Sequence, residues 1–191
     1  AMSGVTNELI KKSFEISDNF SESEHDVLVS SGEQVACSLI AGRLIHEGYE
    51  SRSWLSWQVP ILTKGKYKNS RINQINKKNI IKYLKKGGIP IVTGFQGLND
   101  ENRITTIGRG GSDASAIMIA KFFKAERCII YTDVEGVYTT DPNKLKNAKK
   151  IKVISYEEML EMASLGAKVM QPVSIQDARL YRSGVEVISS F

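Results

Sequence analysis

A glycine-rich segment, residues 105–113, is the part of this sequence best suited to bind an anion. It reads T-T-I-G-R-G-G-S-D and leads directly into an expected helix. The three glycines let backbone N–H groups approach a ligand at a helix N-terminus, and Arg109 can hold a carboxylate or phosphate through two parallel hydrogen bonds. A capped helix, with Ser112 or Asp113 as the N-cap, explains the last two residues equally well. For Arg109 beside three glycines, we favour a functional role.

Two further segments could contact a ligand. Residues 131–142 read Y-T-D-V-E-G-V-Y-T-T-D-P, in which Asp133 could accept ribose hydroxyls and Tyr138 could lie along a nucleotide. Taken alone, this segment is better explained as an aspartate-stabilised turn. Glu33 could bind an ammonium group, or it could interact with the dipole of a helix that begins there. Taken alone, the dipole explains Glu33 better.

The sequence suggests no catalytic triad, no paired carboxylates and no metal cluster built from protein side chains. A carboxylate that accepts a phosphoryl group needs none of these, because its pKa of about 4 keeps it ionised at neutral pH. Phosphoryl transfer to such an acceptor depends on positioning and on neutralising charge with cations, N–H dipoles and Mg²⁺.

The expected elements alternate between helices and strands. Residues 89–94 and 127–132 are short β-branched runs typical of buried strands, and residues 95–104 are expected to form a hairpin. We expect further strands over residues 54–61 and 185–188, with a loop after the first and a polar linker over residues 17–24. Helices are expected over residues 3–16, 33–46, 77–86, 112–123, 155–165 and 168–182. This alternation predicts one α/β domain with a largely parallel sheet covered on both faces.

Composition narrows the class of protein. The chain has 191 residues, of which 41% are hydrophobic and 25% charged, as in an ordinary globular protein. It has no apolar run of the roughly 20 residues that span a bilayer, and its N-terminus does not resemble a signal peptide. Two distant cysteines, Cys37 and Cys128, fit a reducing compartment, and we expect a cytoplasmic protein without a membrane partner.

The charge distribution is uneven. Residues 51–99 carry ten basic side chains and no acidic one, although the whole chain has a net charge of only +5. A basic block of this kind could bind nucleic acid or a polyphosphate. Because aromatic residues are not interleaved through it, we favour a solvated lysine-rich surface and expect no nucleic-acid partner.

Three blocks together resemble the aspartate kinases of the amino-acid-kinase family. Residues 105–113 are similar to T-T-L-G-R-G-G-S-D, and residues 132–142 resemble T-D-V-x-G-V-Y-T-x-D-P. Residues 155–169 look like the third block of the family, and residues 1–9 like the segment that follows its second strand. The resemblance implies a three-layer αβα sandwich around a mainly parallel sheet. It also implies ATP-dependent phosphorylation, with Mg²⁺, of the aspartate side chain to 4-phospho-L-aspartate, which leads to lysine, threonine and methionine.

The resemblance also implies roles for individual residues. Arg109 would hold the α-carboxylate of aspartate, Glu33 would hold its ammonium group, and Phe95 would line the pocket. The remaining aspartate contacts would be Thr6, Gly110, Ser112 and Asp113. The nucleotide would be held by Thr132, Asp133, Gly136, Tyr138 and Lys168, with Lys168 near the phosphates. The implied catalytic residues are Arg109, Asp113 and Lys168, and no residue is assigned to a metal.

The sequence departs from the family pattern in three ways. The family opens with a strand and a K-[FY]-G-G loop whose lysine neutralises the transferring phosphoryl group, and this chain, which begins with Ala, has no such segment. Asn143 stands where the family usually has arginine, and Lys144 could replace that arginine only as a point charge. The C-terminal ACT regulatory domains are missing as well. We therefore interpret residues 1–191 as one catalytic domain, truncated and inactive alone, from a protein expected to form homo-oligomers.

Two other functions remain open. The chain could belong to another member of the same family, acting on glutamate, acetylglutamate, carbamate or UMP. The pair of Glu33 and Arg109 argues instead for a free amino acid, which carries both an ammonium group and a carboxylate. The chain could also come from a non-catalytic ligand-binding paralogue, which the missing lysine and Asn143 favour. The glycine segment and Asp113 oppose that reading.

Overall fold

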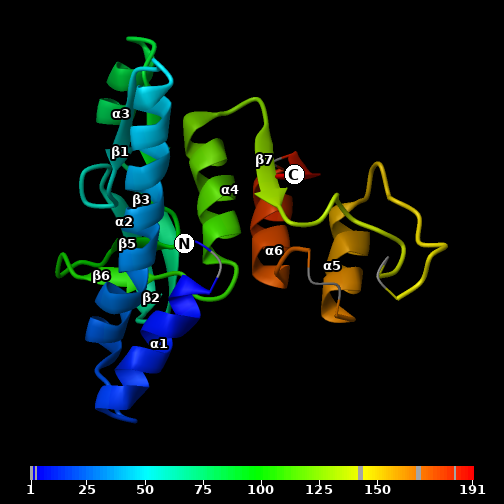
Figure 1. Ribbon diagram of the computed structural model, residues 1–191, viewed down its shortest axis with the longest axis horizontal. Coiled ribbons are helices and arrows are strands. Elements are labelled where there is room, and N and C mark those ends of the chain that lie inside the picture. The colour runs from blue at the N-terminus through cyan, green and yellow to red at the C-terminus, as the bar shows by residue number, and fades with distance from the viewer. Residues whose placement is uncertain (1, 3, 142–143, 167–168, 183) are drawn as a thin grey trace. The chain divides into compact units, whose positions relative to one another are not determined.

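The computed structural model describes residues 2, 4–141, 144–166, 169–182 and 184–191. They form two compact units, Ala1–Gly111 and Ser112–Phe191, here called the N-terminal unit and the C-terminal unit (Figure 1). The expectation of a single catalytic domain over the whole chain stays a prediction. Within the described residues, no helix combines the length and the apolar character needed to cross a membrane.

The N-terminal unit packs helices against two small sheets. In one sheet β1 and β4 are parallel, and in the other the order is β3-β2-β5-β6, with β2 and β5 parallel and the other neighbours antiparallel. Helix α2 packs against α1, β1, β4 and β6. The elements are α1 (Val5–Ile16), α2 (Glu22–His46), β1 (Ser51–Trp54), β2 (Ile61–Lys66), β3 (Asn69–Ile75), α3 (Lys78–Leu84), β4 (Ile89–Val92), β5 (Gln96–Leu98) and β6 (Ile104–Thr106).

Helix α2 is longer than the sequence predicts. It has 25 residues and begins at Glu22, within the expected polar linker, rather than at residue 33. Its early buried positions include Asp26 and Ser30, so the first turns lack the apolar stripe that marks a helix in a sequence. Glu33 therefore lies inside the helix and not in its first turn. The dipole explanation for Glu33 is wrong, because the effect is confined to the terminal turn.

The segment after residue 54 is also different from the prediction. The expected strand over residues 54–61 is a turn region between the end of β1 and the start of β2, and the expected loop after it is the β2–β3 hairpin. Thr63 and Ser70 occupy buried positions of this hairpin. Because these two inward side chains are polar, they interrupt the apolar alternation that indicates a strand. The expected hairpin after Phe95 is confirmed as the antiparallel pair β5–β6.

The C-terminal unit contains one parallel strand pair, β7 with β8. Ser155 caps α5 in a reciprocal capping box with Glu158. The last helix begins at Pro172 rather than at residue 168, because the fixed φ of proline suits the first helical position. The elements are α4 (Gly111–Phe123), which starts at the unit boundary, β7 (Cys128–Thr132), α5 (Tyr156–Ser164), α6 (Pro172–Tyr181) and β8 (Val185–Ser189).

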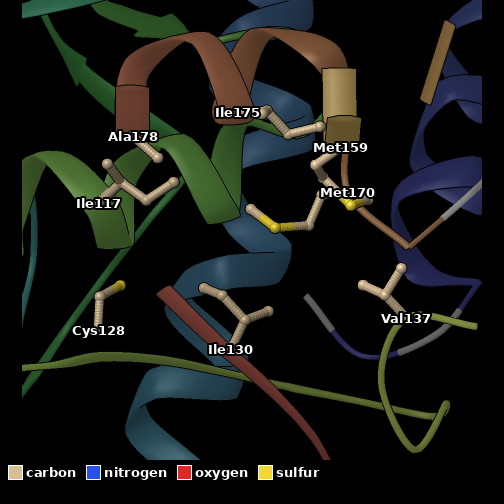
Figure 2. Packing of buried hydrophobic residues seen from close by; sticks show 8 residues of the cluster. All are labelled: Ile117, Cys128, Ile130, Val137, Met159, Met170, Ile175 and Ala178. Carbon is tan, nitrogen blue, oxygen red and sulfur yellow. The ribbon is translucent and has the colours of Figure 1, made fainter. Parts of the chain in front are cut away.

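The core of the C-terminal unit is apolar. Figure 2 shows the side chains of this cluster, which come from α4, β7, α5, α6 and the connecting segments. They are Ile117, Cys128, Ile130, Val137, Met159, Met170, Ile175 and Ala178. With parallel strand pairs in both units and helices packed beside them, the predicted α/β class is confirmed.

Candidate functional site

The glycine segment forms a tight turn between β6 and α4. Gly108 and Gly110 have φ values of 81° and 74°, in the left-handed region that glycine adopts without strain. The turn is closed by a hydrogen bond of 3.0 Å in which the Gly111 N–H donates to the Gly108 carbonyl oxygen. Arg109 lies between the two left-handed glycines, and its side chain is exposed. The structure therefore presents the arginine to solvent on a turn that its flanking glycines form without strain.

Phe95 is brought against this turn. The Ile107 N–H donates a hydrogen bond of 3.0 Å to the Phe95 carbonyl oxygen. A Cβ atom on Gly111 would lie 2.7 Å from Cδ2 of the Phe95 ring, so the ring occupies the space that any other residue at position 111 would need. Phe95 itself has a φ of 64°, which is a strained conformation for a bulky residue. Such strain is typical of functional sites.

The β2–β3 turn supports the other side of the glycine segment. A Cβ atom on Gly108 would lie 3.0 Å from the Lys68 carbonyl oxygen and 3.3 Å from Oδ1 of Asn69. The glycine segment thus packs closely against this turn, which the sequence analysis placed in a loop without a role.

Thr6 and Glu33 lie on two helices that pack together. Thr6 is half-buried near the start of α1, and Glu33 is half-buried within α2. Burial raises the pKa of the Cys37 thiol to about 11, and the negative charge of Glu33 one turn away adds to the effect.

Ser112 and Asp113 lie in the first turn of α4, where backbone N–H groups lack helical partners. Asp113 is half-buried, and burial raises the pKa of its carboxyl group. Burial also raises the pKa of the Cys128 thiol, with a smaller contribution from the charge of Asp113. The carboxylate of Asp113 is thus partly desolvated, which strengthens its interaction with any cationic or hydrogen-bonding ligand.

The segment that follows β7 carries the expected nucleotide ligands. Thr132 ends the strand, and its carbonyl oxygen accepts hydrogen bonds from Ser190 N at 2.9 Å and Ser190 Oγ at 3.0 Å. Its hydroxyl donates to Oδ1 of Asp133 at 3.1 Å, and Asp133 is exposed. The two side chains therefore stand together at the carboxyl end of a parallel strand, where ligands bind in α/β folds.

Gly136 and Tyr138 continue this segment. Gly136 is buried with a φ of 139°, and a Cβ atom there would lie 3.0 Å from Cε of Lys150. The Tyr138 hydroxyl donates to Oε2 of Glu135 at 2.8 Å, and this hydrogen bond raises the pKa of Tyr138. Lys168 and Asn143 lie outside the described residues, so their predicted roles stay predictions.

Comparison with known proteins identifies the family. Residues 1–188 match the amino acid kinase family. The chain belongs to this family. It is 47% identical over 194 residues to the aspartokinase of Rickettsia felis, an alignment that covers 100% of this chain and 48% of that protein. The chain therefore spans about half the length of the curated relatives it matches.

Solved structures of this family share the fold. The aspartate kinase from Synechocystis superposes with a TM-score of 0.84 at 36% identity, covering 100% of this chain and 31% of that one. E. coli aspartokinase III, solved in complex with aspartate and ADP, superposes with a TM-score of 0.82 at 30% identity, covering 98% of this chain and 44% of that one. The expected amino-acid-kinase fold is confirmed.

The candidate site residues fall into two groups. In the N-terminal unit, Phe95 and residues 108–111 are in direct contact, while Thr6 and Glu33 lie on adjoining helices. In the C-terminal unit, Thr132 and Asp133 are hydrogen-bonded, and Gly136 lies on the same segment. Asp26, a buried carboxylate of α2, was not among the predicted site residues, because the helix was expected to start seven residues after it.

Proposed function

We propose that the protein carrying this chain is an aspartate kinase, which transfers the γ-phosphoryl group of ATP to the side-chain carboxylate of L-aspartate. The observation that carries this proposal is the turn of residues 108–111, which exposes Arg109 between two left-handed glycines beside the Phe95 ring. The 47% identity to aspartokinases supports the choice of substrate, since solved uridylate kinase at 22% identity shares only the fold.

Aspartate would be recognised by its two charged ends. Arg109 would hold the α-carboxylate with two parallel hydrogen bonds, and Glu33 would pair with the ammonium group. Phe95 would exclude water from one side of the substrate. Thr6, Gly110 and Ser112 would donate the remaining hydrogen bonds, and Asp113 would orient the donors around the reacting carboxylate.

ATP would be held by the segment after β7. The exposed carboxylate of Asp133 and the hydroxyl of Thr132 would form hydrogen bonds to the ribose, and the ring of Tyr138 would lie along the nucleotide. Gly136 allows the backbone to turn beside them. Lys168 would contribute positive charge at the phosphates, and Mg²⁺ would supply the rest of the charge neutralisation that phosphoryl transfer requires.

The reaction needs no general base from this chain. The carboxylate of aspartate is ionised at neutral pH and can attack phosphorus directly. The γ-phosphorus–oxygen bond to ADP breaks as the new bond to the carboxylate oxygen forms, so no proton moves. The product, 4-phospho-L-aspartate, would serve lysine, threonine and methionine biosynthesis. We place the enzyme in the cytoplasm and expect the full-length protein to be a homo-oligomer.

An acyl-phosphate assay with ATP, Mg²⁺ and hydroxylamine tests the proposal on the full-length protein. We expect aspartate-dependent hydroxamate, and a fall of about 100-fold in kcat/KM for aspartate in the Arg109→Ala variant, because two charge-assisted hydrogen bonds are lost. Arg109→Lys should recover only part of the rate, since lysine lacks the planar fork. Arg71→Ala, which removes an exposed arginine of β3, is the matched control and should retain activity.

Other results would replace the proposal. Equal product with glutamate or another carboxylate acceptor would assign the chain to a different amino acid kinase. Binding of aspartate without product from the full-length protein would indicate a non-catalytic paralogue.

A further inference from the structure

The most completely buried charged side chain of the N-terminal unit, Asp26, is bound to the segment that carries Arg109. Asp26 lies on the second turn of α2 and is 0% exposed. Its Oδ2 accepts hydrogen bonds from Thr106 N at 2.8 Å and Lys68 N at 2.9 Å. Its Oδ1 accepts a bond of 2.8 Å from the Thr106 hydroxyl and a longer one of 3.2 Å from Lys68 N. The carboxylate thus joins three segments that are distant in the sequence.

These contacts require a carboxylate and not merely a polar side chain. Both oxygens of Asp26 face donors, so an amide in its place would turn its NH₂ group towards a backbone N–H. A buried carboxylate is costly unless hydrogen bonds compensate its charge, and here two backbone N–H groups and one hydroxyl do so. If the carboxylate were removed, the Thr106 N–H would be buried without this partner, and the Lys68 N–H would lose its side-chain acceptor.

The two segments that Asp26 binds hold the glycine turn on both sides. Thr106 ends β6 and stands three residues before Arg109. Lys68 forms the β2–β3 turn with a φ of 63°, a conformation that costs energy in a residue other than glycine. Its carbonyl oxygen is the atom against which Gly108 packs. Asp26 therefore fixes the strand that leads into the glycine turn and also the turn that supports it.

The same helix carries Glu33. Asp26 and Glu33 are seven residues apart on α2, which is about two turns and places them on one face roughly 10 Å apart along the axis. One rigid helix therefore carries the proposed ammonium ligand and, through Asp26, the support of the proposed carboxylate ligand. The distance between Glu33 and Arg109 would select an α-amino acid, which carries both an ammonium group and a carboxylate, over a molecule that carries only one of these charges.

The neighbouring acids of α2 do not duplicate this arrangement. Glu24 pairs with Arg103, and Glu22 lies 3.8 Å from the Lys68 ammonium group, but these carboxylates are more than half exposed. Exposed ion pairs contribute little to structure. Glu24 therefore provides a control carboxylate on the same helix, with a charged partner but no contact to the glycine turn among the described bonds.

We infer that Asp26 is a positioning residue for aspartate, which sets the spacing between Glu33 and Arg109 by binding Thr106 and Lys68. This inference rests on the proposed function. Asp26 is fully buried and would act only through the segments that hold the proposed aspartate ligands. Its replacement should therefore weaken aspartate binding and leave nucleotide binding unchanged.

The test compares Asp26→Asn with Glu24→Gln in the full-length protein, each an acid-to-amide change of minimal size. We expect Asp26→Asn to raise KM for aspartate about 10- to 100-fold, because a displacement of about 1 Å in Arg109 or Glu33 has an effect of this order. KM for ATP should stay within about twofold of the parent value. By hydrogen exchange, the Lys68 and Thr106 amides should open at least about tenfold faster. Glu24→Gln should change none of these quantities.

A second pair of variants serves if Asp26→Asn does not fold. Thr106→Val removes one of the bonds to Asp26 and should raise KM for aspartate about threefold, while Thr106→Ser, which keeps the hydroxyl, should restore it. An unchanged KM for aspartate, or equal increases for aspartate and ATP, would reduce Asp26 to a general stabiliser of the fold. A parent protein with no aspartate-dependent product would instead remove the proposed function, and the inference with it.

Discussion

The two units of this chain have cores of different chemistry. Both bury aliphatic side chains, but the N-terminal unit also buries many polar ones, several of them hydrogen-bonded to one another, whereas the described C-terminal unit buries few. The buried polar residues of the N-terminal unit are Ser13, Asp26, Ser30, Ser51, Ser56, Thr63, Ser70, Thr93, Gln96, Thr105 and Thr106. Those of the C-terminal unit are Ser115 and Ser174.

This difference corresponds to two ways of holding a site. Hydrogen bonds are directional, so a buried hydrogen-bond network fixes strands and turns in one arrangement, as Asp26 does for the glycine turn. An apolar core that includes Met159 and Met170 fills space with adaptable side chains and restricts geometry less. The N-terminal unit carries Glu33 and Arg109, whose spacing must be accurate if they bind the two charged ends of aspartate as proposed. Polar burial therefore lies in the unit where the proposed function needs accurate geometry.

The largest expected effect is on the apolar core. Ile117→Ala removes a fully buried side chain from the cluster of the C-terminal unit and leaves a cavity. We expect the free energy of unfolding to fall by about 2–5 kcal/mol, measured by urea denaturation. Met159→Leu, which conserves volume in the same cluster, should cost less than about 1.5 kcal/mol. Similar losses from both variants would show that this core is as geometrically specific as the polar one.

A smaller effect is expected in the polar core of the N-terminal unit. The Thr63 and Thr105 hydroxyls are hydrogen-bonded at 2.6 Å, and Ser70 donates to Thr105 at 3.1 Å. Thr63→Val should destabilise the protein by about 1 kcal/mol. The double variant Thr63→Val/Thr105→Val should cost at least about 0.5 kcal/mol less than the sum of the single ones, because it leaves no unpaired hydroxyl of the pair. Additive losses in urea denaturation would mean that the network is not coupled.

The smallest effect concerns Asp113 and depends on pH. Burial raises the pKa of this carboxyl group above its usual 3.8, so the folded state binds more protons than the unfolded state over the interval above that value. The free energy of unfolding therefore falls as pH rises through this interval, and the full cost remains at pH 7. Asp113→Asn should raise Tm at pH 7 by on the order of 1–2 °C while activity is lost.

Scanning calorimetry at two pH values checks this prediction. The gain in Tm should shrink as pH falls towards 3.8 and vanish below it, where the parent carboxyl group becomes protonated in both states. A variant that is less stable than the parent at pH 7 would contradict the sign of the effect, and would show that the Asp113 carboxylate has a stabilising partner in the fold.

The sequence predicted elements better where the core is apolar. In the C-terminal unit the expected strands over residues 127–132 and 185–188 agree with β7 and β8 to within a residue. In the N-terminal unit the first half of α2 and the β2–β3 hairpin were missed, since their buried positions include Asp26, Ser30, Thr63 and Ser70. Pattern recognition relies on apolar side chains facing inward, so a polar interior conceals the period.

The candidate site was predictable to a different extent. The glycine segment was recognisable because its residue types are needed locally, at Gly108 and Gly110, for a left-handed backbone. The role of Asp26 could not be predicted, because its partners Lys68 and Thr106 lie 42 and 80 residues away and meet it only in the folded chain. Local conformational needs are visible in a sequence, whereas hydrogen bonds between distant segments are not.

The left-handed backbone at Phe95 sets thermal stability against activity at a single position. A library randomised at position 95 and sorted only for survival after heating should enrich glycine, which adopts a φ of 64° without strain. The same library sorted for product should keep phenylalanine, whose ring fills the space over Gly111. Heat selection and product selection would then drive one codon in opposite directions.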